Sequence, residues 1–312
     1  MNDRHDRRDF LCAAARTTAA FGMAGLGLGS VNLGSRVAQA IEPIRRVGGP
    51  KFKFSLAAYS YRDLLNAKPP KLSLDDFITD CAKMQLEGTE LTSYYFPKDP
   101  TDEYLRHLKQ LAFDLGLDVS GTAVGNNFCL PPGPKRDEQI ADVKRWIERA
   151  EVLGAPVIRI FSGNAGGGLS VDEAHKLAVA GIEETCQYAG EHGVYLALEN
   201  HGGLTATADG LLELVNDVKS PWFGVNLDTG NFNTPDPYGD LARIAPYAVN
   251  VQVKISMHPA GGKRQPADLK RLAQILRDSG YRGYIVLEFE EPTDPLVECP
   301  RYIAEMRQAF LG

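Results

Sequence analysis

Short apolar runs alternate with longer amphipathic stretches along most of the chain. After residue 51, eight runs rich in β-branched and aromatic residues predict strands, and each is followed by a stretch with 3.6-residue apolar spacing that predicts a helix. The predicted strands are 52–59, 88–91, 117–124, 156–161, 194–199, 223–228, 249–255 and 284–289. The predicted helices are 75–84, 102–115, 136–153, 170–192, 208–218, 237–245, 266–279 and 300–310.

This alternation predicts an α/β protein built as a (β/α)8 TIM barrel. Eight strand–helix pairs in about 260 residues match that barrel in number and size. The alternative is a doubly wound open sheet, which usually carries a glycine-rich phosphate turn after its first strand, and residues 57–65 contain no glycine. The glycine-rich stretch 163–168 follows the fourth strand and lacks the Lys-Ser/Thr pair of a phosphate loop, so we interpret it as a loop at the top of the barrel.

The first 40 residues differ from the rest and are set apart from the predicted barrel. Arg7-Arg8-Asp9-Phe10-Leu11 precedes a weakly apolar run over residues 12–33, and Ala38-Gln39-Ala40 offers a small-residue cleavage pattern. This stretch resembles a twin-arginine export signal; the alternative is an uncleaved disordered tail. We therefore expect a signal over 1–40, a linker over 41–51 and the barrel over 52–312, with export to the periplasm or a similar location.

Charge and cysteine content narrow the partners that we expect. The formal net charge is −6 and no basic stripe is present, which disfavours nucleic acid and anionic membranes as partners. No segment after the predicted signal approaches the roughly 20 apolar residues of a membrane span. Four of the five cysteines follow the predicted signal, and because no CxxC pair occurs we expect buried free thiols, with disulfides as the alternative: Cys81, Cys129, Cys186 and Cys299. The sequence leaves open whether the protein forms a homo-oligomer.

Polar side chains at strand ends carry the candidate chemistry. The fifth and sixth strands end in Glu199 and Asp228, and Gln252 and Lys254 share one face of the seventh strand because side chains alternate in direction. A barrel brings the carboxyl ends of all its strands to one mouth. We therefore expect four side chains to surround one point, with Lys254 just above them: Glu199, Asp228, Gln252 and Glu288.

Three carboxylates at one point repel one another, and a divalent cation would remove that repulsion. Oxygen donors favour a hard ion, so Mn²⁺ or Mg²⁺ is expected ahead of Co²⁺ or Zn²⁺. The alternative is that these acids cap neighbouring helices or form ion pairs with Lys254 and Arg159.

The strand ends together resemble those of the xylose isomerase-like sugar isomerase/epimerase superfamily, which includes the tagatose 3-epimerases. The matching segments are Leu198-Glu199-Asn200-His201-Gly202-Gly203, Asn226-Leu227-Asp228-Thr229-Gly230-Asn231, Val251-Gln252-Val253-Lys254 and Val286-Leu287-Glu288. The resemblance covers Phe52 to the carboxyl end. It implies that Glu199, Asp228 and Glu288 bind one divalent metal together with position 252, where His is usual and this sequence has Gln.

The resemblance also implies a reaction, which agrees with the chemistry of the acids. Glu199 and Glu288 would move a proton α to the carbonyl of a sugar through an enediolate, which gives epimerisation or isomerisation. Candidates for substrate contacts are His201, Lys254, Arg159 and Asn126. Three of these have a structural alternative: a satisfied loop residue for the histidine, a core ion pair for the arginine and turn chemistry for the asparagine.

These observations lead us to expect an exported, metal-dependent sugar isomerase or epimerase with a small carbohydrate substrate. One alternative is a lyase or dehydratase that uses the same intermediate on oxidised glycosides or inositol derivatives. Another is a non-catalytic sugar-binding barrel that has lost metal competence, for which Gln252 is the clue. The related apurinic endonucleases are disfavoured, because they need a multi-histidine zinc site and a basic DNA face, and the sequence has six histidines, of which one, His201, lies at a plausible site.

Overall fold

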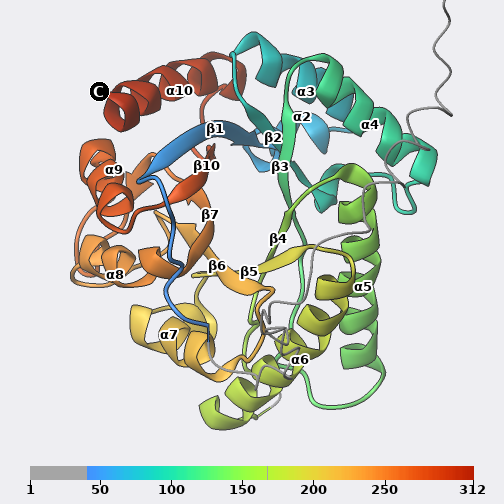
Figure 1. Cartoon of the computed structure of the whole chain (residues 1–312), viewed down its shortest axis with the longest axis vertical. Coiled ribbons are helices and arrows are strands. Elements are labelled where there is room, and N and C mark those ends of the chain that lie inside the picture. Colours follow the sequence, from blue (N-terminus) through green and yellow to red (C-terminus); the bar gives the residue numbers. More distant parts are fainter. Residues whose placement is uncertain (1–40, 167) are drawn as a thin grey trace, which may run out of the picture. The chain divides into compact units, whose positions relative to one another are not determined.

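Eight short parallel strands close into a barrel, and helices cover its outside (Figure 1). The computed structural model describes residues 41–166 and 168–312. β1 pairs with both β2 and β10, which closes the ring, and the strands follow one another around it in chain order. They are β1 (Lys51–Ala57), β2 (Gly88–Thr92), β3 (Asp118–Ala123), β4 (Val157–Ile160), β5 (Tyr195–Glu199), β6 (Phe223–Asp228), β7 (Ala248–Val253) and β10 (Arg282–Leu287). The predicted TIM barrel is confirmed.

The helices bury one face each against the outside of the barrel. In α3 the buried residues Leu74, Phe77, Ile78 and Cys81 recur at helical spacing, and Ser73 caps its start by accepting from the Asp76 amide. The helices are α2 (Arg62–Leu65), α3 (Leu74–Lys83), α4 (Asp102–Asp114), α5 (Pro134–Leu153), α6 (Val171–Glu191), α7 (Ala208–Asp217), α8 (Pro237–Ile244), α9 (Leu269–Asp278) and α10 (Pro295–Leu311).

Two predicted boundaries near the carboxyl end differ from the structure. The last helix begins at Pro295 rather than at Pro300, because Pro295 occupies its first turn and Asp294 caps it by accepting from the Leu296 amide. A short hairpin of β8 (Ser256–Met257) and β9 (Gln265–Pro266) was not predicted, and it delays the start of α9 to Leu269. Both differences lie outside the barrel strands. The barrel strands themselves end within two residues of their predicted ends, the first, seventh and eighth of them two residues earlier.

Residues 41–50 contact the amino end of β7. The Ile44 amide donates to the Pro246 carbonyl at 3.0 Å, and the Arg46 guanidinium donates to the carbonyl of Ala248, the first residue of β7. In Figure 1 this segment is the blue trace that runs from beside α7 to the start of β1.

A polar cluster at the amino end of the barrel joins three strands. Lys53 Nζ of β1 donates to Asp118 Oδ2 of β3 at 2.7 Å, and the Tyr284 hydroxyl of β10 also donates to that carboxylate. These two hydrogen bonds, that of Lys53 foremost, lower the pKa of Asp118 below its ordinary value. The cluster stabilises the charged carboxylate, although Asp118 remains 64% exposed.

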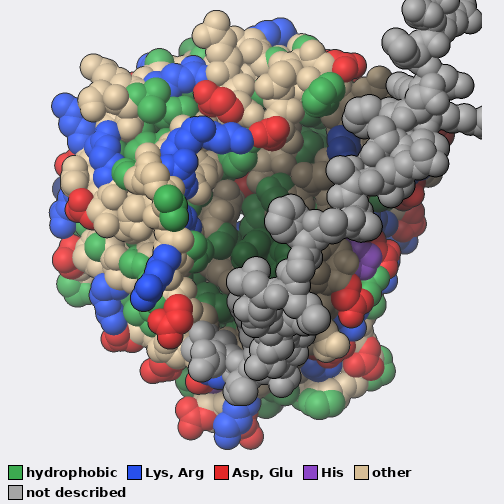
Figure 2. Space-filling model, viewed as in Figure 1, with side chains coloured by type: hydrophobic (Ala, Val, Ile, Leu, Met, Phe, Trp, Pro, Cys, Tyr) green, Lys and Arg blue, Asp and Glu red, His purple; other side chains and the backbone are tan. Residues whose placement is uncertain are grey.

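The outer surface carries charges of both signs. In the view of Figure 2, acidic and basic side chains of the described residues are interspersed over the outer helices. Within residues 41–166 and 168–312, no helix combines the length and apolar character needed to cross a membrane. The export signal expected over residues 1–40 lies outside the described part of the chain.

The four cysteines that follow the expected signal are buried and unpaired: Cys81, Cys129, Cys186 and Cys299. Burial raises the pKa of the Cys81 thiol to about 12 and that of the Cys129 thiol to about 11. The prediction of buried free thiols is confirmed.

Candidate active site

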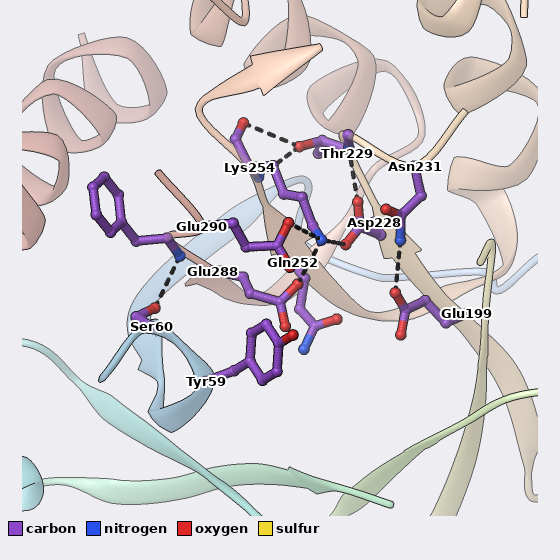
Figure 3. A network of polar contacts seen from close by, with 12 residues as sticks. Tyr59, Ser60, Glu199, Asp228, Thr229, Asn231, Gln252, Lys254, Glu288 and Glu290 are labelled. Carbon is purple, nitrogen blue, oxygen red and sulfur yellow. Dashed lines mark hydrogen bonds and ion pairs between the residues drawn. The ribbon is translucent and has the colours of Figure 1, made fainter. Parts of the chain in front are cut away.

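The carboxyl end of the barrel gathers acidic side chains from strands that are neighbours in the sheet. Glu199 and Asp228 are the last residues of β5 and β6, and Asp228 lies beside Gln252 in the pairing of β6 with β7. Glu288 directly follows β10, whose Val286 pairs with Gln252. All four side chains are buried, and they lie around one region in Figure 3.

The ammonium of Lys254 occupies the centre of this region. Lys254 Nζ lies 2.8 Å from Glu290 Oε2, 3.2 Å from Glu288 Oε2 and 3.4 Å from Asp228 Oδ2. Its side chain is 11% exposed, and Figure 3 shows the three carboxylates pointing toward it. The predicted position of Lys254 above the acids therefore becomes, in the structure, a position among them.

The turn after β6 holds Lys254 in place. The Thr229 hydroxyl accepts from the Lys254 amide at 2.9 Å and donates to the Lys254 carbonyl at 3.4 Å. Gly230 lies against the Lys254 side chain, and a Cβ at that glycine would come within 2.8 Å of Lys254 Cβ. Local backbone contacts therefore position the side chain before any substrate enters.

A second cation balances Glu199. Arg159 Nε of β4 lies 2.9 Å from Glu199 Oε2, and Asn231 Nδ2 donates to Glu199 Oε1 at 2.8 Å. Arg159 Nη1 also donates to the Val124 carbonyl at 2.7 Å, and the guanidinium lies over the ring of Phe161. The structure thus places Arg159 in the core ion pair that the sequence analysis held as the alternative to a substrate contact, and a role in substrate binding stays a prediction.

A network of amides lies inside the barrel beneath these ion pairs. Glu90 of β2 accepts from Gln252 Nε2 at 2.7 Å and from Asn250 Nδ2 at 3.0 Å. Gln252 Oε1 accepts from Asn226 Nδ2 at 2.7 Å, and Asn226 Oδ1 accepts from Asn250 Nδ2 at 2.9 Å. Below it, the hydroxyls of Ser55 and Ser120 bond at 2.8 Å. Polar groups therefore fill space that branched apolar side chains usually occupy in such barrels.

Glu90 is not among the site residues predicted from the sequence. The signal that was available is an acidic residue inside a predicted buried strand, between Thr89 and Leu91. Asn226 and Asn250 had a similar signal, because each lies two residues before a predicted site residue and so shares its face of the strand. Pairing across the barrel, from β2 to β7, could not be inferred from either signal.

Burial shifts the acids toward their neutral forms. It raises the pKa of Asp228 to about 7 against the opposing charge of Lys254, and it raises the pKa of Glu90 to about 7, with the charge of Glu288 adding to the effect. Burial also raises the pKa of Glu199, although Arg159 opposes the shift. Burial of Lys254 would lower the pKa of its ammonium, but the surrounding carboxylates, Asp228 foremost, raise it above the ordinary value. The ammonium is thus the fixed charge of the site.

The arrangement does not fit the divalent metal that the resemblance implies. Both amide atoms of Gln252 are bonded inside the barrel, and both oxygens of Glu199 have cationic or amide partners. Asp228 Oδ2 is buried without a hydrogen bond in the described part of the chain, but its nearest cation is Lys254. No group of three or more His, Cys, Asp or Glu among residues 41–166 and 168–312 is arranged to hold a metal ion. Metal binding by Glu199, Asp228, Gln252 and Glu288 remains a sequence prediction.

Asn126 and His201, which were also predicted to contact the substrate, lie outside the cluster of acids and cations. Asn126 bridges to the backbone of Phe161, donating to its carbonyl at 2.8 Å and accepting from its amide at 2.9 Å, so its side chain joins two loops. His201 is partly exposed, and its ring stacks on that of Phe161 with centroids 4.6 Å apart. Burial, together with the charges of Arg159 and Lys254, lowers the pKa of His201, which favours a neutral ring at the rim of the site.

Sequence comparison assigns most of the chain to a known family. The family described as "Xylose isomerase-like TIM barrel" matches residues 78–306. These residues include every strand from β2 to β10 and all of the acidic strand ends. A search of curated proteins gives no significant match.

Solved structures with the same fold include sugar epimerases. A D-psicose 3-epimerase crystallised in the presence of D-fructose is 20% identical with a TM-score of 0.69, over 83% of this chain and 100% of that chain. A D-psicose 3-epimerase from Clostridium cellulolyticum H10 gives 17% identity and a TM-score of 0.70, over 83% and 99% of the two chains. A 3-keto-D-glucoside 4-epimerase from E. coli gives 16% and 0.65, over 83% and 100%. At these identities the likeness shows the fold.

Proposed function

The chain belongs to the xylose isomerase-like TIM barrel family, and on this premise we propose that it is a sugar isomerase or epimerase that moves a proton α to a carbonyl. The observation that carries the proposal is the buried set of carboxylates and cations at the carboxyl end of the barrel, where TIM-barrel enzymes build their active sites. The sugar epimerases among the solved structures support the substrate class.

The geometry supplies two acid–base groups for such a transfer. Glu199 and Glu288 come from β5 and from the end of β10, with β6 and β7 between them, so they approach the centre from different directions (Figure 3). One of the two groups, as a carboxylate, removes the proton from the carbon beside the carbonyl, and the other, as a carboxylic acid, delivers a proton to the opposite face, which inverts that carbon. Return to the neighbouring carbon would give an isomer instead.

The negative charge that develops on the carbonyl oxygen needs a positive partner. The resemblance implies a divalent metal in that role, but the donor atoms do not provide a centre for one. The proposal therefore rests on the proton transfer, for which the acids are present. A lyase reaction would begin with the same proton removal, so identification of the products is needed to distinguish it from epimerisation.

We also propose, from the sequence alone, that residues 1–40 direct export by the twin-arginine route, which would place the enzyme among extracellular or periplasmic carbohydrates. Detection of the shortened protein in the periplasm of an expressing bacterium would support this. A protein that stays in the cytoplasm at full length would contradict it.

The test is proton exchange into a panel of keto-sugars and oxidised glycosides in deuterated water, followed by NMR. We expect deuterium at the carbon beside the carbonyl, with a product of unchanged formula. Glu288→Gln should lower the exchange rate by about 10²- to 10⁴-fold because it removes an acid–base group. The matched control is Glu138→Gln on the exposed surface of α5, which should keep the wild-type rate.

Three outcomes would contradict the proposal. Exchange that survives Glu288→Gln would remove Glu288 from the reaction. Release of water or of an aglycone would replace the isomerase with a lyase or dehydratase. Binding of sugars without any exchange would favour the non-catalytic barrel.

A further inference from the structure

The position that a metal would need is filled by a side chain of this protein. We propose that the ammonium of Lys254, and not a divalent metal, is the cation of this site, and that it binds the carbonyl oxygen of the substrate. The sugar chemistry in this statement rests on the proposed function, whereas the exclusion of a metal does not.

The first support is that the site is built around the ammonium. Three carboxylates surround Lys254 Nζ within 3.4 Å, and its side chain is 11% exposed. The Thr229 hydroxyl bonds both the amide and the carbonyl of Lys254, which fixes the backbone of that residue. Gly230, which has no side chain, leaves room for the side chain of Lys254. A divalent ion at the same point would meet a fixed positive charge, which would repel it.

The second support is that Gln252 is turned away from the mouth. The NH₂ group of Gln252 faces Glu90, because Gln252 Nε2 donates to Glu90 Oε1 at 2.7 Å. This fixes the oxygen of Gln252 toward Asn226, which donates to it. The amide that stands at the usual histidine position therefore completes the polar interior of the barrel and offers no donor atom to a metal.

The third support is that one partner of Lys254 can leave. Glu290 is 35% exposed, whereas Asp228 is 0% and Glu288 is 7% exposed. An ammonium has three N–H groups. When Glu290 turns outward, one of these groups becomes free for a substrate oxygen, while Asp228 and Glu288 keep the nitrogen in place.

The reaction then balances without any further reactant. The carbonyl oxygen accepts a hydrogen bond from Lys254, and a carboxylate takes the proton from the adjacent carbon. The electron pair of that C–H bond forms the enediolate, whose oxyanion is stabilised by the ammonium. Delivery of a proton to carbon by the second carboxyl group regenerates the carbonyl and leaves that group as a carboxylate. The two carboxyl groups have then exchanged protonation states, which exchange of protons with water resets, and Lys254 is unchanged.

Titration of the full chain with Mn²⁺ in a calorimeter tests the exclusion of metal without any substrate. We expect no saturable binding of Mn²⁺ to the wild type. Lys254→Met and the double variant Gln252→His/Lys254→Met, which restores the usual histidine, should bind Mn²⁺ at least tenfold more tightly than the wild type does. The control Lys83→Met, on the exposed end of α3, should behave as the wild type. One equivalent of Mn²⁺ bound by the wild type with a Kd below about 0.1 mM would overturn the proposal. Equally weak binding by both Lys254 variants would overturn it as well.

Deuterium exchange in the presence of EDTA tests the role of the ammonium. We expect the wild-type rate to stay within twofold of the untreated rate, and the Lys254→Met rate to fall at least 10²-fold. Loss of wild-type exchange in EDTA, with recovery on adding Mn²⁺, would overturn the proposal. If Lys254→Met does not fold, as judged from its thermal melt, the wild-type titration and the EDTA measurement decide. Absence of exchange on every sugar would count against the proposed function, while the Mn²⁺ titration would still decide whether the site excludes metal.

Discussion

Asp118 begins β3 at the amino end of the barrel and Asp228 ends β6 at the carboxyl end, and their carboxyl groups shift in opposite directions. Hydrogen bonds from Lys53 and Tyr284 lower the pKa of Asp118 in an exposed position. Burial raises the pKa of Asp228 to about 7, although Lys254 lies 3.4 Å away. The same residue type therefore favours its charged form at one end and resists it at the other.

The difference shows what each end contributes. At the amino end, the charge of Asp118 is stabilised by water and by Lys53, so the ion pair joins two strands with little cost to the free energy of folding. At the carboxyl end, acids are taken out of water and only partly compensated by Lys254 and Arg159, which costs stability. Such an arrangement is typical of active sites, where groups must change protonation during the reaction.

The two ends of the barrel should differ most in how the exchange rate responds when the charge of Asp228 or of Asp118 is removed. Asp228→Asn takes away a carboxylate that holds the Lys254 ammonium, so exchange into sugars should fall by about 10²-fold or more. Asp118→Asn should leave the exchange rate unchanged. Rates of both variants in deuterated water, read by NMR, check this. Equal rates in the two variants would mean that the carboxyl end is not the active site.

A smaller contrast should come from two glycines that pack against key side chains. A Cβ at Gly230 would meet the Lys254 side chain at 2.8 Å, and a Cβ at Gly88 would meet the Tyr284 ring at 2.6 Å. Each change to alanine should cost about 1–3 kcal/mol of stability through overpacking. Gly230→Ala should also slow exchange by about tenfold, since a displacement of about 1 Å costs up to 10²-fold.

Denaturant unfolding of both glycine variants and their exchange rates measure these effects. If Gly88→Ala slowed exchange as much as Gly230→Ala, the loss would come from general destabilisation rather than from the position of Lys254.

The smallest effect concerns the pH dependence of stability at the amino end. The pKa of folded Asp118 lies below its unfolded value, so its contribution is present above about pH 4 and is lost as pH falls through the folded pKa. The wild type should exceed Asp118→Asn in stability by up to about 1 kcal/mol at pH 6 and by nothing at the lowest pH. Urea unfolding at several pH values checks this. A stability difference between the wild type and Asp118→Asn that grows as the pH falls would contradict a lowered pKa for Asp118.

Much of the fold could be predicted because its signals are local. β6 was predicted at its observed bounds, 223–228, from a continuous apolar run that ends in an acid. The start of α10 was predicted wrongly because two prolines, Pro295 and Pro300, could each begin the helix. The β8–β9 hairpin was not predicted because it consists of only two residue pairs. Strand ends, and hence the candidate site, were predictable because a closed barrel sends all of them to one mouth.

The contacts within the site were less predictable. The sequence places Lys254 above the acids by parity, but its choice of Asp228, Glu288 and Glu290 as partners depends on the spacing of three strands. The role of Gln252 depends on Glu90, which is 162 positions away in the chain. The glutamine at the position where the resembled family usually has histidine therefore indicated a difference at the site, but the sequence did not show which residues it contacts.

The sequence by itself determined the alternation of strands and helices, the barrel, and the set of polar residues at its carboxyl end. These follow from apolar periodicity and from the side-chain parity of strands, which are properties of neighbouring residues. The tertiary structure decided which acids face a cation and which face amides. Burial and the approach of distant strands set those pairings and the pKa shifts, and both exist only once the barrel has closed.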